Sequence, residues 1–165
     1  MRVGIGFDSH NLVPGRKLVL GGVEVAFELG LQGHSDADVL IHAIIDALFG
    51  AAALGSIGEH FPDTDAKYRG IASTKLLAEA MIKIRNSGFR PVNVDSVIVA
   101  ERPELAPCID AMRKRIAGIM GIPDDRVSVK ATTTEGKDAT GRGEDIAAHA
   151  VVLVIENSTP GQESD

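Results

Sequence analysis

Two residues near the N-terminus, Asp8 and His10, have side chains suited to metal binding or proton transfer. They follow the apolar segment 1–7, which reads as a strand. Residues i and i+2 of a strand lie on the same side, so Asp8 and His10 would point into one space while Ser9 points away. The pair is compatible with half of a metal site, an ion pair, an acid–base pair or the solvated end of a strand.

A third candidate ligand, His42, lies in an apolar segment predicted to form a buried helix over 35–52, with Ser35 as its N-cap. Asp38 precedes His42 by four residues and Asp46 follows it by four, so the three side chains share one helical face. Polar groups inside an apolar helix are costly unless something pairs with them. The polar stripe formed by these three side chains is therefore expected to pair with other groups.

Asp8, His10 and His42 together supply one carboxylate and two imidazoles. Catalytic zinc sites use such a set, in which three protein ligands leave the fourth position open. A buried Asp–His hydrogen-bond network without metal is the alternative. Asp46 could fix the tautomer of the imidazole, or it could be a capping or interface carboxylate. His34, before the predicted helix, could donate to a phosphate held by the free N–H groups there, or could simply be solvated.

The segment Thr-Thr-Thr-Glu at 132–135 lies where a strand is predicted to leave the sheet. Hydroxyls and exposed N–H groups suit phosphate oxygens, and a carboxylate beside them suits magnesium. Alternation would put Thr133 and Glu135 on one side of the strand. Threonine is also common in strands for its β-propensity alone. Arg142, between two glycines, could offer phosphate a guanidinium fork, which alone is a weak signal.

These residues would be positioned by an α+β fold, a mostly antiparallel or mixed sheet with three helices packed on one face. Val3, Ile5 and Phe7 are spaced for one face of the first strand, which is predicted to be buried. Gly21-Gly22 predicts a hairpin, and the polar stretch 55–65 predicts a functional loop. The predicted helices are 35–52, 71–86 and 107–120, and the predicted strands are 3–8, 17–20, 23–27, 92–100, 127–134 and 146–155.

The composition is that of an ordinary globular protein, with 44% hydrophobic and 24% charged residues among 165. A net charge of −6 argues against nucleic acid as a partner. A single cysteine, Cys108, excludes an internal disulfide. The longest apolar run is interrupted by charge, so no membrane association is expected and the cytoplasm is the predicted location. We expect one catalytic domain over 1–156 and a disordered tail over 157–165.

Five motifs in order along the chain carry a resemblance to a known family: GFDSH, GHSDADVLIHAIIDAL, IGEHFPDTD, AERPELAP, and ATTTEG followed by TGRGE. The chain resembles the 2-C-methyl-D-erythritol 2,4-cyclodiphosphate synthases of the non-mevalonate isoprenoid pathway over about residues 1–156. The resemblance implies that Asp8, His10 and His42 bind zinc. It also implies a homotrimer whose active sites are each shared by two subunits.

The resemblance implies a reaction as well, that of a phosphorus–oxygen lyase. The 2-phosphate of 4-diphosphocytidyl-2-C-methyl-D-erythritol 2-phosphate attacks the β-phosphorus of the same molecule, CMP leaves, and a cyclic diphosphate forms. Zinc would hold the β-phosphate, and magnesium or manganese at Glu135 would bridge the α- and β-phosphates. His34 and Thr133 match residues that stabilise the transition state.

Further positions match substrate contacts of the family. Some match contacts to the methylerythritol, the phosphates and the ribose: Asp8, Ser9, His10, His34, Ser35, Ser56, Ile57, Gly58, Phe61, Pro62, Asp63, Thr64 and Asp65. Others match the cytosine pocket, its surroundings and the trimer cavity: Ala100, Glu101, Arg102, Pro103, Glu104, Leu105, Ala106, Thr132, Thr133, Thr134, Glu135, Ala139 and Arg142. Two positions depart from the pattern, since Ser56 stands where the family has aspartate and Ala139 where it often has phenylalanine.

Two other functions fit the residues less closely. In a zinc-dependent phosphohydrolase the open zinc position would activate water, yet the sequence offers no clear general base beside Asp8 and His10. A non-catalytic module that binds cytidine nucleotides would need the same pocket without turnover.

Overall fold

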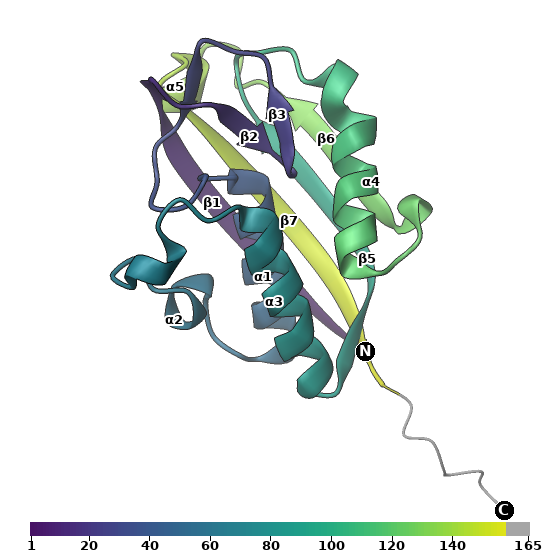
Figure 1. Ribbon diagram of the computed structural model, residues 1–165. Helices are drawn as coiled ribbons and strands as arrows, with labels where there is room; N and C mark the ends of the chain where they lie inside the picture. Colours follow the sequence, from purple (N-terminus) through teal and green to yellow (C-terminus); the bar gives the residue numbers. More distant parts are fainter. Residues whose placement is uncertain (158–165) are drawn as a thin grey trace, which may run out of the picture.

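The computed structural model describes residues 1–157, so the tail predicted over 157–165 lies, apart from Asn157, outside the described residues. Three long helices cover one face of a five-stranded sheet (Figure 1). The helices are α1 (Val39–Ala52), α3 (Ser73–Asn86) and α4 (Ile109–Met120). The strands are β1 (Arg2–Pro14), β4 (Leu29–Leu31), β5 (Phe89–Val99), β6 (Val127–Thr132) and β7 (Asp145–Glu156). The predicted α+β fold is confirmed.

The sheet is mixed, in the order β4-β1-β7-β5-β6. All neighbours are antiparallel except β5 and β6, which are parallel and connected through α4. The predicted hairpin is present as β2 (Leu18–Leu20) and β3 (Val23–Val25). Its two turn residues, Gly21 and Gly22, have φ of +59° and +74°, the conformation that a two-residue turn favours. The short strand β4 was not predicted.

The helix α1 is buried as expected, but its N-cap is Asp38, three residues after the predicted N-cap Ser35, and the helix begins at Val39. Asp38 accepts the N–H of Ile41 (3.1 Å) and those of Gly21 (2.9 Å) and Gly22 (2.6 Å). Burial raises the pKa of Asp38 to about 6 even though these N–H groups act to lower it. Asp38 therefore ties the hairpin to α1 and takes no part in the polar stripe.

The prediction of a buried face for Val3, Ile5 and Phe7 was wrong for the single chain. These side chains are 66%, 70% and 54% exposed, and the side of β1 that faces α1 carries glycine instead. A Cβ at Gly6 would lie 2.0 Å from the carbonyl oxygen of Ala43, and one at Gly4 equally close to Ala47. The glycines let the strand and the helix approach closely, which leaves the large apolar side chains on the opposite face of the sheet.

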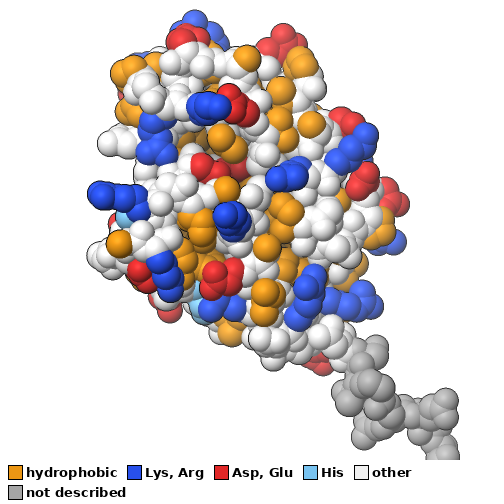
Figure 2. All heavy atoms as spheres, viewed as in Figure 1, with side chains coloured by type: hydrophobic (Ala, Val, Ile, Leu, Met, Phe, Trp, Pro, Cys, Tyr) orange, Lys and Arg blue, Asp and Glu red, His pale blue; other side chains and the backbone are white. Residues whose placement is uncertain are grey.

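The helix-covered side of the molecule differs from this exposed sheet face. Acidic and basic side chains are interspersed over the helix-covered side (Figure 2). The outer face of β1 is instead apolar and continues onto the neighbouring strand. Ile5 pairs with Val151 of β7, which is 41% exposed, and the Phe7 ring lies 4.7 Å from that of His149.

The remaining differences from the predicted layout include β1, which runs to Pro14 where the prediction ended at Asp8, and several short helices that were not predicted. The loop 55–65 contains α2 (Ile57–His60), and α5 (Asp138–Gly141) precedes β7; three-residue helical turns η1 (Ala66–Tyr68), η2 (Ala106–Cys108) and η3 (Asp124–Arg126) complete the chain. Elements of three or four residues carry too little periodicity to be read from sequence. None of the described helices combines the length and the apolar character that a membrane span requires.

Candidate metal centre and substrate cavities

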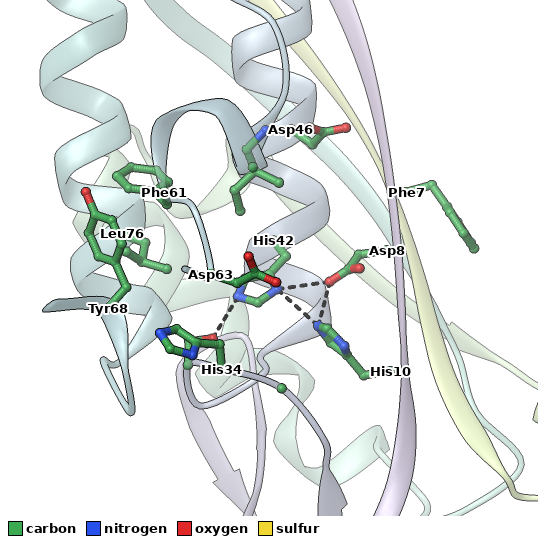
Figure 3. A pocket seen from close by; sticks show the side chains of 14 residues that line it. Phe7, Asp8, His10, His34, His42, Asp46, Phe61, Asp63, Tyr68 and Leu76 are labelled. Atoms are coloured by element: carbon green, nitrogen blue, oxygen red, sulfur yellow. Dashed lines mark hydrogen bonds and ion pairs between the residues drawn. The ribbon is translucent and has the colours of Figure 1, made fainter. Parts of the chain in front are cut away.

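Asp8, His10 and His42 come together between β1 and the first turn of α1 (Figure 3). Asp8 and His10 lie on the side of β1 that carries Gly6, so the close contact between strand and helix brings both side chains to His42. Phe7 lies on the other side of the strand. The expectation from i, i+2 alternation is met in the structure.

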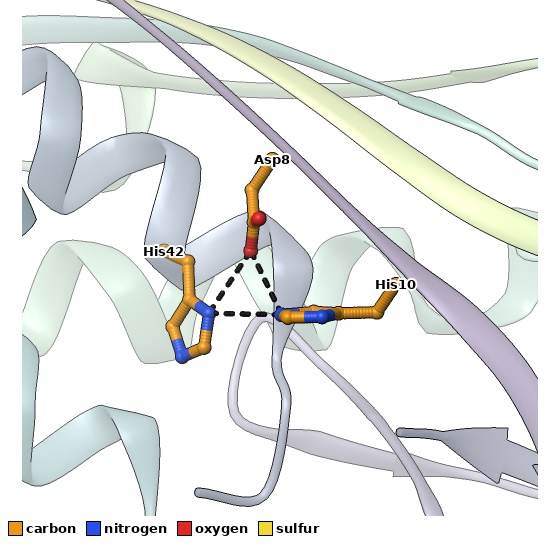
Figure 4. Close-up of side chains that lie close together, drawn as sticks. All are labelled: Asp8, His10 and His42. Carbon is orange, nitrogen blue, oxygen red and sulfur yellow. Dashed lines mark hydrogen bonds and ion pairs between the residues drawn. The ribbon is translucent and has the colours of Figure 1, made fainter. Parts of the chain in front are cut away.

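The three ligand atoms form a compact triangle (Figure 4). Asp8 Oδ2 lies 3.0 Å from His10 Nε2 and 3.0 Å from His42 Nδ1, and the two nitrogens are 3.2 Å apart. Ligands about 2.0–2.1 Å from a tetrahedral zinc ion would be roughly 3.4 Å apart, so the triangle fits such an ion with little movement. Among the residues that the structure describes, no other group of three metal-ligating side chains converges in this way.

The electrostatics of Asp8 suit a metal ligand. Burial would raise its pKa, but the contacts of the carboxylate with the imidazoles of His10 and His42 lower the pKa to about 2. The carboxylate is therefore ionised at neutral pH, as metal binding requires.

Sequence reasoning missed Ser73, which contacts the other nitrogen of His42, and Asp36, which holds Ser73. Nε2 lies 2.9 Å from the hydroxyl of Ser73, and that hydroxyl donates to Asp36. Ser35 also approaches Nε2, at 3.2 Å. Ser73 is 31 residues from His42, so no local spacing could have revealed the contact.

The triad opens into a cavity of about 370 Å³ (Figure 3). Its lining includes most of the residues predicted on the metal side: Asp8, His10, His34, Ser35, His42, Ile57, Gly58, Phe61 and Asp63. The lining is completed by Phe7, Gly33, Asp46, Tyr68 and Leu76, and it does not include the predicted Ser9, Ser56, Pro62, Thr64 and Asp65. His34 Nε2 lies 3.3 Å from the carbonyl oxygen of Asp65, which ties the start of this region to the loop after α2.

Asp46 faces the same cavity but does not contact His42. It accepts the N–H of Ile57 at 3.0 Å and so caps α2, which settles its role among the alternatives that the sequence left open. The hydroxyl of Ser56 donates to Glu59 at 3.0 Å, and the N–H of exposed Ser9 donates to Asp8 Oδ1 at 3.0 Å.

A second cavity, of about 440 Å³, lies elsewhere in the chain. It is lined by Ala100, Glu101, Arg102, Pro103, Glu104, Leu105, Ala106, Ala131, Thr132 and Thr133. The predicted segment 100–106 and the first two threonines are thus brought together. The two cavities share no lining residue, so the structure does not bring the metal triad and the threonine segment into one site within a single chain.

The threonine segment itself differs from the prediction. β6 ends at Thr132, two residues early, and Glu135 has a φ of +54°, so strand alternation does not extend from Thr133 to Glu135. The two still lie close, because the N–H of Glu135 donates to Thr133 Oγ1 at 3.2 Å. Arg142 is held by Glu144 through two hydrogen bonds of 2.8 and 2.9 Å. Its guanidinium fork is therefore engaged in this chain.

The whole chain is similar to proteins of one family. Residues 1–155 match the YgbB family. The 2-C-methyl-D-erythritol 2,4-cyclodiphosphate synthase of Moorella thermoacetica is 56% identical over 156 residues, covering 94% of this chain and 96% of the relative. That of Lachnospira eligens is 58% identical over 151 residues, with coverages of 92% and 82%.

Solved structures show the same fold. A 2C-methyl-D-erythritol-2,4-cyclodiphosphate synthase in its CDP-bound form has a TM-score of 0.86 at 38% identity, and the match covers 93% of this chain and 100% of that one. The bifunctional IspDF from Campylobacter jejuni has a TM-score of 0.91 at 41% identity, where the match covers 94% of this chain and 42% of that longer chain.

Proposed function

The chain belongs to the YgbB family, that of the 2-C-methyl-D-erythritol 2,4-cyclodiphosphate synthases, and we propose that it catalyses this cyclisation in isoprenoid precursor biosynthesis. An oxygen of the substrate 2-phosphate forms a bond to the β-phosphorus. The bond from the β-phosphorus to the oxygen that bridges it to the α-phosphate breaks, and CMP leaves with the electron pair. The observation that carries the proposal is the Asp8–His10–His42 triangle, which opens into a cavity large enough for a phosphorylated ligand.

Two divalent cations are part of the proposal, zinc at Asp8, His10 and His42 and magnesium or manganese at Glu135. Bound there, they would neutralise and align the diphosphate, which is most of what phosphoryl transfer needs. His34 and Thr133 would donate to the transferring group from the two sides. The open mouth of the triad and the exposure of Glu135 leave room for substrate at both positions.

The substrate contacts follow the two cavities. The cytosine would occupy the cavity of 100–106 and Thr132, and the methylerythritol and its phosphates the cavity of His34, Ser35 and Asp63. Gly58 and Ser56 would meet the ribose at the edge of α2. The CDP complex of a solved relative supports a cytidine nucleotide as the ligand class.

A homotrimer with active sites between subunits accounts for the separation of the two cavities. In such an assembly the metal triad of one chain would meet the threonine segment of its neighbour. The exposed apolar face of β1 and β7 supports an association of this kind. The lyase class and the cytoplasmic location belong to the same proposal.

An assay of product identity tests the function. We expect purified protein with zinc and magnesium to convert the substrate to CMP and the cyclic diphosphate, followed by ³¹P NMR. Release of inorganic phosphate would indicate the hydrolase, and nucleotide binding without turnover would indicate the non-catalytic module. Either result would overturn the proposal.

A further inference from the structure

We propose that Asp36 and Ser73 are positioning residues that fix the proton of His42 on Nε2 and leave Nδ1 free for the metal. The inference deepens the proposed function, because it concerns the metal site on which that function rests. It starts from a chain of three contacts. His42 Nε2 lies 2.9 Å from Ser73 Oγ, Ser73 Oγ donates to Asp36 Oδ1, and the N–H of Ser73 donates to Asp36 Oδ2 at 3.0 Å.

The direction of the hydrogen bonds follows from the acceptor at the end of the chain. An ionised carboxylate can only accept, so Asp36 takes the single hydroxyl proton of Ser73. The oxygen of Ser73 then has only lone pairs to offer to His42. The hydrogen bond between Nε2 and Ser73 can then form only with the proton on Nε2, and in a neutral imidazole this leaves Nδ1 unprotonated.

The alternative tautomer is a real competitor. Nδ1 lies 3.0 Å from Asp8 Oδ2, so a proton on Nδ1 would make a good hydrogen bond to a carboxylate. That proton would occupy the nitrogen which the triangle directs at the metal. Ser73 disfavours the Nδ1-protonated tautomer. In that tautomer the buried Ser73 oxygen would no longer accept a hydrogen bond from His42 Nε2.

The local structure holds Asp36 and Ser73 in place. The N–H of Asp36 donates to the carbonyl of Ile71 at 3.0 Å, so the residues before α1 are bonded to those before α3. Ser73 is the first residue of α3 and is 0% exposed. Ser35 lies farther from Nε2 than Ser73 does, at 3.2 Å, and its oxygen accepts the N–H of Ala37.

Nitrogen-15 NMR of the metal-free protein tests the assignment directly. Near pH 8.5, where imidazole is neutral, long-range ¹H–¹⁵N spectra distinguish the two tautomers. We expect His42 to carry its proton on Nε2 in the wild type and to shift toward Nδ1 in Ser73→Ala. Asp36→Asn should shift it in the same direction but less, because a carboxamide can donate to Ser73 as well as accept. A wild-type proton on Nδ1, or unchanged tautomers in both variants, would overturn the proposal.

Zinc affinity gives a second readout, measured by competition with a chromophoric chelator. Loss of a partner that orients a metal-binding histidine costs about 10-fold or more in affinity, which we expect for Ser73→Ala. The control is Ser96→Ala, which removes another buried serine hydroxyl, bonded to the carbonyl of Ser128 on the far strands, and should leave zinc affinity unchanged. Equal affinities in the wild type and Ser73→Ala would contradict the proposal. Absence of zinc binding in the wild type would instead contradict the proposed function, while the NMR result would still decide the tautomer.

Discussion

Thr133 is the residue at which the proposed chemistry can be tested most simply, since it lines the second cavity and its hydroxyl accepts the N–H of Glu135. A donor aimed at the transferring group matters most in the transition state. We expect Thr133→Ala to lower kcat by far more than it raises KM, with a loss of about 2–4 kcal/mol by analogy with oxyanion-hole donors. Steady-state kinetics provide the measurement. An unchanged kcat with a raised KM would reassign Thr133 to ground-state binding.

Ser56 is one of the two positions at which the sequence departs from the pattern of the family that it resembles, and it is the N-cap of α2, next to Ile57 and Gly58 of the metal-side cavity. An aspartate there would make charge-assisted hydrogen bonds to the ribose diol, which are about twice as strong as neutral ones. Ser56→Asp should bind CMP several-fold more tightly and leave kcat nearly unaltered, as measured by calorimetry and kinetics. Ser56→Asn is the matched control, because it keeps the cap without a second charge beside Glu59. Weaker binding by Ser56→Asp would show that the residue does not face the diol.

The residues of the metal centre divide into those that the sequence could predict and those that it could not. Asp8, His10 and His42 were predictable, because strand and helix periodicity act over a few positions. Asp46 was ambiguous, since the stripe it shares with His42 says nothing about α2, whose N–H it accepts. Ser73 could not be predicted, because only the packing of α3 against α1 brings it to the imidazole of His42.

At the scale of elements, the site depends on the contact between β1 and α1. Gly6→Ala would place a methyl group 2.0 Å from a helix carbonyl and force the two apart. We expect a loss of at least about 2 kcal/mol in unfolding free energy, together with weaker zinc binding because Asp8 and His42 separate. Denaturant unfolding and chelator competition measure both effects.

Gly118→Ala is the control for that substitution. Gly118 lies in α4, and a Cβ there meets nothing within 4 Å. It should stabilise the protein by up to about 1 kcal/mol through helix propensity and leave zinc binding alone. Equal effects of the two substitutions would mean that the close approach at Gly6 does not position the metal site.

The same contact explains where strand prediction failed. Alternation along β1 was read correctly, but hydrophobicity assigned the apolar side to the interior, whereas the glycine side is the one that packs on α1. Hydrophobicity reports that a face is buried and does not report whether a helix or another molecule buries it. The late start of α1 has a different cause, since the tie from Asp38 to the hairpin is a tertiary contact.

At the scale of the whole molecule, the apolar face of the sheet predicts association. Ile5→Glu would place a charge at its centre and should yield monomers at micromolar concentration, where we expect the wild type to form the proposed trimer. The control is Ile82→Glu, since Ile82 is 55% exposed on α3, on the helix side. Light scattering after size-exclusion chromatography gives the masses. A trimeric Ile5→Glu protein, or a monomeric Ile82→Glu protein, would rule out the sheet face as the interface.

Because the two cavities have no lining residue in common, two variants that are each inactive should regain activity when they form mixed trimers. His42→Ala removes a ligand of the metal triad, and Glu135→Ala removes the carboxylate of the threonine segment. Each variant alone should therefore be inactive. Every trimer that contains both variants has one site among its three that pairs an intact metal side with an intact threonine side from the neighbouring chain, so about a third of the sites in mixed trimers would be complete. Coexpression of the two tagged variants, followed by an assay of the doubly tagged fraction, measures this recovery. Sites completed within single chains would give no recovery. Sites shared between chains instead mean that a defect in one half of the site is compensated by a neighbouring chain in which that half is intact.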